Sequence, residues 1–567
     1  MKRYWKYIRP YIQYYILGPC FMMMEVVGDV LLPYMLAKII NQGIAERNVV
    51  YIIKIGAIMG LIAVIMAVGG VLGAWFASKA SMNFGADLRM DLFEKIQQFS
   101  FQNIDNFSTG SLITRLTNDI TQIQNMIMMT LRMCLRSPGI LIGAMVMAFV
   151  ISPKLAAIFI IVLPVLAVLI VVIMRRAFPQ FRTLQEKLDA LNSCIQEGLV
   201  GIRLIKSFVR GDYEEMRFEK RNQQLKEANL TAMKTMLLYT PLMTLALNIT
   251  TVVVVWSGGN MIVVGNMQVG DLTAFTNYIV QIMSSLTMLS IAFLNWARAI
   301  ASFRRVGEVL DEKIDLTDEN AKHKDRAVCE GSVEFQNVSF RYYKNSPEWV
   351  IENISFKLEA GKTLGIIGST GSGKSTLVSM IPRLYDTDEG TVLVDGINVR
   401  DYGLKPLREG IGMVLQNNTL FSGSITENLK WGDEHADEKA VRKAAQNAQA
   451  AGFIDSFKDG YRTRLEQSGN NVSGGQKQRL CIARALLKCP KILILDDSTS
   501  AVDTATERAI REALHSEYKD MTKIIIAQRI RSVMDADEIL VLDNGKTAGF
   551  GTHEQLLADC PVYREIY

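Results

Sequence analysis

The residues best suited to chemistry form a glycine-rich segment between an apolar strand-like run and a helix-like run. In KTLGIIGSTGSGKSTLVSMI, Gly368 and Gly373 are separated by four residues and are followed by Lys374 and Ser375. Glycines let successive backbone N–H groups curl around a phosphate, and the start of the following helix adds positive potential. The spacing therefore predicts a phosphate-binding loop, in which Lys374 reaches the β and γ phosphates and Ser375 ligates Mg²⁺.

A second run begins at residue 491 and reads KILILDDSTSAVD. Its four consecutive aliphatic residues are followed directly by two carboxylates, Asp496 and Asp497. A buried strand that carries carboxylates to its tip usually presents them to a metal ion or to a water molecule. Asp496 is predicted to hold Mg²⁺ as the acidic partner of the phosphate-binding loop.

Between these runs lies NVSGGQKQRL, residues 471–480, which closely resembles the signature motif of ATP-binding cassette (ABC) proteins. The C-terminal half resembles their nucleotide-binding domain from end to end. The resemblance implies that Tyr342 stacks on adenine and that Gln416 senses Mg²⁺ and faces the membrane domain. It implies further that Ser500 and Asp503 lie in a loop that communicates across a dimer.

The resemblance assigns the following residues. The ATP-binding residues are Tyr342, Gly368, Ser369, Thr370, Gly371, Ser372, Gly373, Lys374, Ser375 and Thr376. The Mg²⁺ ligands are Ser375, Gln416 and Asp496. The signature motif, which completes the ATP site of a second chain, consists of Val472, Ser473, Gly474, Gly475 and Gln476.

Two positions depart from the family pattern. Members that hydrolyse ATP well carry glutamate directly after the Mg²⁺ aspartate, and here that residue is Asp497. A carboxylate one methylene shorter falls roughly 1 Å short, which can cost about 10²-fold in rate. The strand KIIIAQR ends in Gln528 where the family has a histidine, and glutamine cannot carry charge or pass a proton. Asp497 and Gln528, with Gln416, are the predicted catalytic positions of a degenerate site.

The N-terminal half has the composition of a membrane domain. A chain of 567 residues is too long for one compact domain. Hydrophobic residues make up 49% of it, and the apolar runs long enough to cross a bilayer concentrate before residue 304. The candidates number about six and fall at residues 15–36, 55–78, 137–151, 155–174, 236–264 and 272–296. The basic, aromatic N-terminal stretch is expected to form a retained interfacial helix.

Charge sets the expected orientation. Lysine and arginine cluster before the first span and after the fourth and the last, whereas GGNMIVVGNMQVGD between the fifth and sixth has none. The positive-inside rule then places both termini in the cytoplasm. The net charge of +5 is spread out, which disfavours a nucleic-acid partner, and the scattered cysteines are expected to be reduced thiols.

The connections after the second and fourth spans are long and amphipathic, so we expect helices that extend into the cytoplasm. FSTGSLITRLTNDI, residues 107–120, is similar to the first intracellular coupling segment of ABC exporters. We expect an all-α transmembrane domain at 1–312, a linker at 313–331 and an α/β nucleotide-binding domain at 332–567.

Glu25 and Asp29 lie one helical turn apart inside the first span. Acids at membrane depth are costly, and their default interpretation is functional, here attraction of a cationic substrate. The alternative is that they pair with a polar group on another helix and only fix packing.

The resemblance covers nearly the whole chain. It implies an ATP- and Mg²⁺-dependent exporter of the bacterial inner membrane, multi-pass in the bilayer, with its nucleotide-binding domain in the cytoplasm. The degenerate positions favour one half of a heterodimeric exporter of hydrophobic or cationic compounds, with a non-identical partner that keeps glutamate and histidine. A homodimeric lipid or peptide exporter and a nucleotide-gated regulator without transport remain as alternatives.

Overall fold

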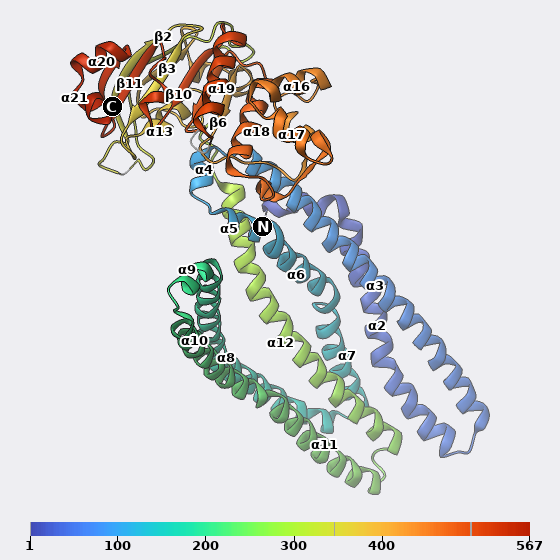
Figure 1. Ribbon diagram of the computed structural model, residues 1–567. Helices are drawn as coiled ribbons and strands as arrows, with labels where there is room; N and C mark the ends of the chain where they lie inside the picture. The colour runs from blue at the N-terminus through green and yellow to red at the C-terminus, as the bar shows by residue number, and fades with distance from the viewer. Residues whose placement is uncertain (1, 345, 499–501) are drawn as a thin grey trace. The chain divides into compact units, whose positions relative to one another are not determined.

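The computed structural model describes residues 2–344, 346–498 and 502–567. The chain folds as two compact units (Figure 1). The first comprises Met1–Gln97 and Gly110–Asp311, and the second comprises Gln98–Thr109 and Glu312–Tyr567. The segment at 98–109 therefore packs with the C-terminal unit, although it lies between two helices of the first unit.

The first unit is helical throughout its described regular elements. They are η1 (Lys2–Tyr4), α1 (Trp5–Ile8), η2 (Arg9–Tyr11), α2 (Ile12–Lys38), η3 (Ile39–Ile44), α3 (Val49–Gln97), α5 (Thr109–Thr114), η4 (Arg115–Asp119), α6 (Ile120–Met133), α7 (Arg136–Ile151), α8 (Pro153–Val200), α9 (Ile202–Ser207), α10 (Gly211–Leu237), α11 (Tyr239–Val263) and α12 (Val269–Asp311). The elements η3 and η4 are π-helical.

Several helices are longer than a bilayer needs, as the long connections in the sequence indicate. Helix α3 has 49 residues and α8 has 48, whereas a span takes about 20. Five helical segments in the described part of the chain are long and apolar enough to cross a membrane: Trp5–Ile44, Val49–Gln97, Thr109–Ile151, Pro153–Val200 and Gly211–Val263. The sixth predicted span lies within α12, one continuous helix of 43 residues.

Long helices pair along their length. Helices α8 and α10 run side by side, as do α2 and α3 (Figure 1). The N-terminal stretch forms short helical turns that pack on α3, where the buried Tyr7 donates a hydrogen bond from its hydroxyl to Asp91 Oδ2 over 2.9 Å.

The second unit is an α/β unit, as expected, and contains a largely parallel sheet. The six-stranded sheet has the order β12-β11-β3-β10-β9-β6, with β12 antiparallel and the others parallel. An antiparallel sheet has the order β2-β1-β4-β5, and β7 pairs with β8. The strands are β1 (Val333–Phe340), β2 (Ile351–Leu358), β3 (Thr363–Gly368), β4 (Glu389–Val394), β5 (Ile397–Asn398), β6 (Ile411–Val414), β7 (Gly423–Ser424), β8 (Arg464–Leu465), β9 (Ile492–Asp496), β10 (Thr522–Ile526), β11 (Glu538–Asp543) and β12 (Lys546–Gly551).

Helices and short turns precede, connect and follow these strands. They are α4 (Phe101–Asp105), α13 (Lys374–Ser379), η5 (Val399–Asp401), α14 (Leu404–Glu409), α15 (Ile425–Leu429), α16 (Glu438–Asn447), α17 (Ala451–Ser456), η6 (Gly460–Arg462), η7 (Gln467–Gly469), α18 (Gly474–Leu487), α19 (Thr504–Glu517), η8 (Ile530–Ser532), α20 (His553–Asp559) and α21 (Pro561–Ile566).

Strand β9 shows why the acids reach the sheet edge. Its five residues are all buried, as in parallel strands covered on both faces. One core lies between the two sheets and against α13, and a second lies between β9 and the helices around α18. With its interior filled, the strand presents polar side chains only where it ends.

Candidate functional site: a nucleotide-binding site

The glycine-rich loop joins β3 to α13 and has the backbone that its sequence predicts. Gly371 and Gly373 have φ values of +85° and +89°, which residues with a Cβ rarely adopt. A Cβ at Gly373 would also lie 2.6 Å from Ile351 Cγ2. Larger residues at these positions would therefore distort the loop that must wrap around phosphate.

Lys374 opens α13 and folds back over the loop. Its Nζ donates hydrogen bonds to the carbonyl oxygens of Gly368 and Ser369, over 2.9 Å and 2.7 Å. Burial lowers the pKa of Lys374, and the carboxylates of Asp496 and Asp497 act in the opposite direction. The ammonium thus lies at the loop where a nucleotide would bring its phosphates.

Ser375 and Asp496 come together although 121 positions separate them in the chain. Ser375 Oγ donates to Asp496 Oδ1 over 2.9 Å, and Asp496 is only 4% exposed. Burial raises the pKa of Asp496, the Ser375 hydrogen bond lowers it, and Asp497 raises it further. A hydroxyl and a carboxylate at one point are oxygen ligands suited to Mg²⁺, so the predicted pair fits that ion.

Asp497 and Gln528 also meet, at the tips of neighbouring strands β9 and β10. Gln528 Nε2 donates to Asp497 Oδ2 over 2.7 Å. Asp497 has a φ of +47°, an uncommon conformation for a residue with a Cβ. Burial raises the pKa of Asp497, while hydrogen bonds from Gln528 and Gln416 oppose the rise. The three predicted catalytic positions therefore share one polar cluster.

Tyr342 lies beside the glycine-rich loop. Its hydroxyl shares a hydrogen bond of 2.8 Å with Thr376 Oγ1 in α13. The residue is 37% exposed, so part of it is accessible to a ligand. This placement is compatible with the predicted stacking on adenine.

The signature motif forms the start of α18. Ser473 is the N-cap residue, its Oγ accepts from the N–H of Gln476, and Gln476 Oε1 accepts from the N–H of Ser473 over 2.9 Å. Arg479 donates to the carbonyl oxygen of Gly475, one turn earlier. The motif thus offers a helix N-terminus, which favours an anion, with its turn held in place by its own side chains.

One of the two predicted dimer-loop residues can be placed. Asp503 is the N-cap of α19, where its carboxylate accepts from the backbone N–H and the hydroxyl of Thr506 over 3.0 and 2.7 Å. The Thr506 hydrogen bonds lower the pKa of Asp503. Ser500 lies outside the described residues.

The acids of the first predicted span meet an arginine that sequence reasoning missed. Arg136 Nη2 lies 2.9 Å from Glu25 Oε1 and 3.3 Å from Asp29 Oδ2. Gln281 Nε2 donates to the backbone oxygen of Asp29 over 2.7 Å. Two carboxylates facing one guanidinium leave a formal charge of −1, as attraction of a cation requires. The ion pairs themselves join two helices, as a packing role requires.

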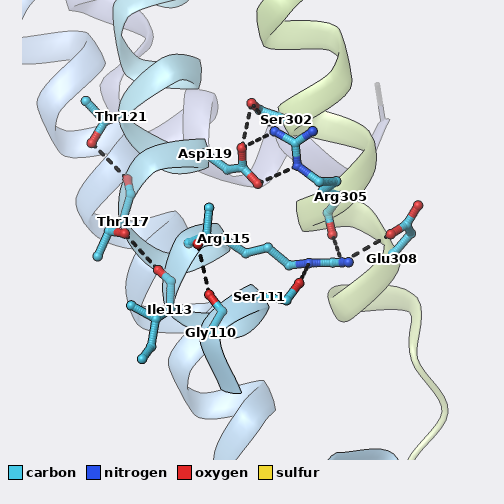
Figure 2. A network of polar contacts seen from close by, with 11 residues as sticks. Gly110, Ser111, Ile113, Arg115, Thr117, Asp119, Thr121, Ser302, Arg305 and Glu308 are labelled. Atoms are coloured by element: carbon cyan, nitrogen blue, oxygen red, sulfur yellow. Dashed lines mark hydrogen bonds and ion pairs between the residues drawn. The ribbon is translucent and has the colours of Figure 1, made fainter. Parts of the chain in front are cut away.

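The segment that resembles a coupling element is held to α12 by two ion pairs, each between a largely buried residue of the segment and a half-exposed residue of α12 (Figure 2). Asp119 is 2% exposed and accepts from Ser302 Oγ and Arg305 Nε, each over 2.8 Å. Arg115 Nη1 contacts the carbonyl oxygen of Arg305 and lies 3.1 Å from Glu308 Oε2. Both Arg115 and Asp119 lie in the π-helical turn η4, an irregularity often found at functional sites.

Comparisons with known proteins agree with this organisation. Residues 15–286 match the family described as "ABC transporter transmembrane region", and residues 351–500 match "ABC transporter". The chain is 39% identical over its full length to the "Uncharacterized ABC transporter ATP-binding protein YfiB" of Bacillus subtilis (strain 168), of which it covers 98%.

Two further relatives have more specific names. The chain is 33% identical to the "Putative multidrug export ATP-binding/permease protein YgaD" of Bacillus subtilis (strain 168), covering 100% of this chain and 98% of that protein. It is 34% identical to the "ATP-dependent lipid A-core flippase" of Pseudomonas aeruginosa, over 89% of this chain and 83% of that protein. A solved bacterial Atm1-family ABC exporter with ATP bound has the same fold, with a TM-score of 0.81, 24% identity and coverage of 99% and 98%.

These matches place the chain in the ABC transporter family. The predicted fold class, a helical transmembrane domain followed by an α/β ABC nucleotide-binding domain, is confirmed. Membership of this family implies ATP-coupled transport across a membrane by a multi-pass protein.

Proposed function

We propose that this chain is one half of a heterodimeric ABC exporter whose own ATP site binds nucleotide but hydrolyses it slowly. The observation that carries this proposal is the contact between Asp497 and Gln528, because both positions depart from the residues of a hydrolytic site. The binding residues, by contrast, are all of the expected type, from Tyr342 through Lys374 to Asp496.

The chemistry of the cluster supports slow hydrolysis. A general base must reach the attacking water, and the shorter side chain of Asp497 holds its carboxylate further back. Gln528 donates a hydrogen bond to that carboxylate but adds no positive charge toward a γ-phosphate. Ser375 and Asp496 would hold Mg²⁺, which when bound neutralises phosphate charge.

The signature motif of this chain then serves the ATP site of the partner. Ser473 and the first turn of α18 present a helix N-terminus to the γ-phosphate held by the other chain. We infer that the partner supplies the missing glutamate and histidine, so that one hydrolytic site drives the complex. Both termini and the nucleotide-binding unit lie in the cytoplasm in this proposal, with the helices in the inner membrane.

The proposed substrates are hydrophobic or amphipathic compounds, including cations. The relative named for multidrug export supports this class, and the net negative cluster of Glu25, Asp29 and Arg136 supports attraction of cations. The flippase relative keeps lipid export by a homodimer as the second candidate.

Affinity purification of the full-length chain from its native membrane tests the assembly. The proposal expects a second half-transporter, with glutamate and histidine at the positions of Asp497 and Gln528, to co-purify, and the complex to hydrolyse ATP well above the lone chain. A homodimer with the same activity as the native preparation would contradict it.

A further inference from the structure

Tyr385 contacts two features of the C-terminal unit, Tyr342 and helix α4. Its ring centroid lies 5.4 Å from that of Tyr342, with the rings nearly perpendicular at 83°. Its hydroxyl donates to Asp105 Oδ2 in α4 over 2.9 Å. The ring also contacts Phe101 of α4 at 5.9 Å and Phe340 of β1 at 5.4 Å. One side chain therefore contacts both the predicted adenine-stacking ring and helix α4.

The backbone that carries Tyr385 is held firmly. Arg383, two residues earlier, pairs through Nε with Asp386 Oδ1 over 2.9 Å. Arg408 Nη2 donates to the carbonyl oxygen of Arg383 over 2.8 Å, and the N–H of Leu384 donates to Ser379 at the end of α13. Because the turn is fixed to the helix that follows the phosphate-binding loop, movement of the Tyr385 ring is confined to its side-chain torsions.

A second polar contact anchors helix α4 within this unit. Asn103 is 3% exposed and donates through Nδ2 to Glu312 Oε1 and to the carbonyl oxygen of Lys313, over 3.2 and 2.9 Å. The Asp105–Tyr385 bond fixes the C-terminal end of the helix. Burial and then the Asp105 hydrogen bond raise the pKa of Tyr385, so its hydroxyl remains a donor throughout the physiological range.

We propose that Tyr385 is a positioning residue for adenine binding, whose ring supports Tyr342 and whose hydroxyl makes adenine affinity depend on the docking of α4. The inference rests on the proposed stacking of adenine on Tyr342. A perpendicular partner presents its ring edge to Tyr342 and limits the rotation of that ring, which favours stacking before the base arrives. Linkage makes this effect reciprocal: if docking of α4 raises the affinity for adenine by some factor, bound adenine must favour docking of α4 by the same factor.

The test compares two ligands of the full-length protein in lipid nanodiscs, without Mg²⁺ so that hydrolysis does not interfere. ATP uses the phosphate-binding loop and the adenine site, whereas inorganic tripolyphosphate uses only the loop. Tyr385→Ala should raise the dissociation constant for ATP roughly 3- to 10-fold, the range expected for an aromatic pair, and leave that for tripolyphosphate unchanged. Equal losses for both ligands, or no loss for ATP, would overturn the proposal.

A conservative pair separates positioning from packing. Tyr385→Phe keeps the ring and removes only the bond to α4, and Asp105→Ala removes the same bond from the other side. Each should raise the ATP dissociation constant about 2- to 5-fold, and the double variant should be no worse than either single one. Additive losses would contradict a shared contact.

Two controls complete the series. Tyr518→Phe also removes one hydroxyl hydrogen bond, to Asn447 over 3.1 Å, and should change neither constant. Tyr342→Ala tests the assumption beneath the inference: if it leaves ATP affinity intact, the adenine assignment fails, whereas a loss with Tyr342→Ala and none with Tyr385→Ala rejects only the role of Tyr385.

Discussion

Gln528 Nε2 donates a 2.7 Å hydrogen bond to Asp497 Oδ2, so the two residues that depart from a hydrolytic ABC site contact one another. They come from adjacent parallel strands, in which Ile526 pairs with Asp496. The two changes therefore affect one cluster and reinforce each other. In the proposed function, a shortened carboxylate held by a neutral donor leaves the site able to bind phosphate but poorly equipped to activate water.

The first prediction concerns the signature motif of this chain, which is proposed to complete the partner's ATP site. In the assembled transporter, Gly475→Glu should nearly eliminate ATPase activity and transport, because a carboxylate at the signature helix would repel the γ-phosphate of the partner's site in poorly screened surroundings. ATPase rates of the purified complex measure this. Gly452→Glu on the nearby α17 is the matched control, since the space around Gly452 is open and activity should be kept. A fully active Gly475→Glu complex would show that this motif does not complete a working site.

The second prediction follows from the buried Asp496. Burial raises its pKa, so the folded protein binds a proton at this carboxyl more readily than the unfolded chain. The charged carboxylate therefore destabilises the nucleotide-free fold above its folded pKa, and this penalty disappears as pH falls below the unfolded value. Asp496→Asn should raise the Tm of the nucleotide-free protein at pH 7.5 by about 1–3 °C and weaken stabilisation by Mg²⁺–ATP.

Thermal unfolding with and without nucleotide checks this prediction. The exposed Asp459 supplies the control, because Asp459→Asn removes a charge from the same unit without a buried site and should leave both Tm values unchanged. A lower Tm for nucleotide-free Asp496→Asn would mean that the charged form is stabilised in the fold.

The third prediction addresses the acids of the first span. If the cluster attracts cations, changing Glu25 and Asp29 to their amides should reduce transport of cationic dyes several-fold and spare neutral substrates, whereas Arg136→Gln should favour the cations. Transport of matched charged and neutral dyes into inverted vesicles distinguishes the cases. Equal losses for both dye types, accompanied by poor protein yield, would assign the ion pairs to packing alone.

The fourth prediction concerns the Asp119–Arg305 pair in Figure 2. Asp119→Ala removes the buried carboxylate that accepts from Ser302 and Arg305, and because the Arg305 side chain is half exposed and can be solvated, we expect a loss of about 1–2 kcal/mol in stability. Because the pair joins η4 to α12, transport per ATP hydrolysed should also fall. The stability loss of the double variant Asp119→Ala with Arg305→Met should be smaller than the sum of the losses of the two single variants. Strictly additive losses in thermal unfolding would exclude a direct interaction.

Much of the nucleotide site could be predicted because its signals are local. The glycine spacing before Lys374 requires a particular backbone, and the apolar run before Asp496 requires a buried strand. Ser375 and Asp496 then meet because parallel strands end at the same edge of a sheet.

The remaining contacts depend on tertiary packing that no short pattern carries. Arg136 lies at the end of the long connection after the second predicted span, with nothing to link it to Glu25, 111 positions away. The likeness at residues 107–120 marked the coupling segment, but it gave no sign that the residues just before it, including Asn103 and Asp105, fold as part of the C-terminal unit. Tyr385 carried no signal of its own, because a tyrosine after a helix is ordinary until its neighbours in space are known.

The degenerate-site account is tested most directly by repairing the site in the purified full-length chain. The double variant Asp497→Glu with Gln528→His restores the longer carboxylate and a group able to carry a proton, and Asp497→Asn is measured beside it. The account predicts that the repaired chain hydrolyses ATP at least about 10-fold faster than the natural chain, while Asp497→Asn stays close to the natural rate. A natural chain that already turns over rapidly, loses its activity with Asp497→Asn and gains nothing from the repair would show that Asp497 is a working base and contradict the account.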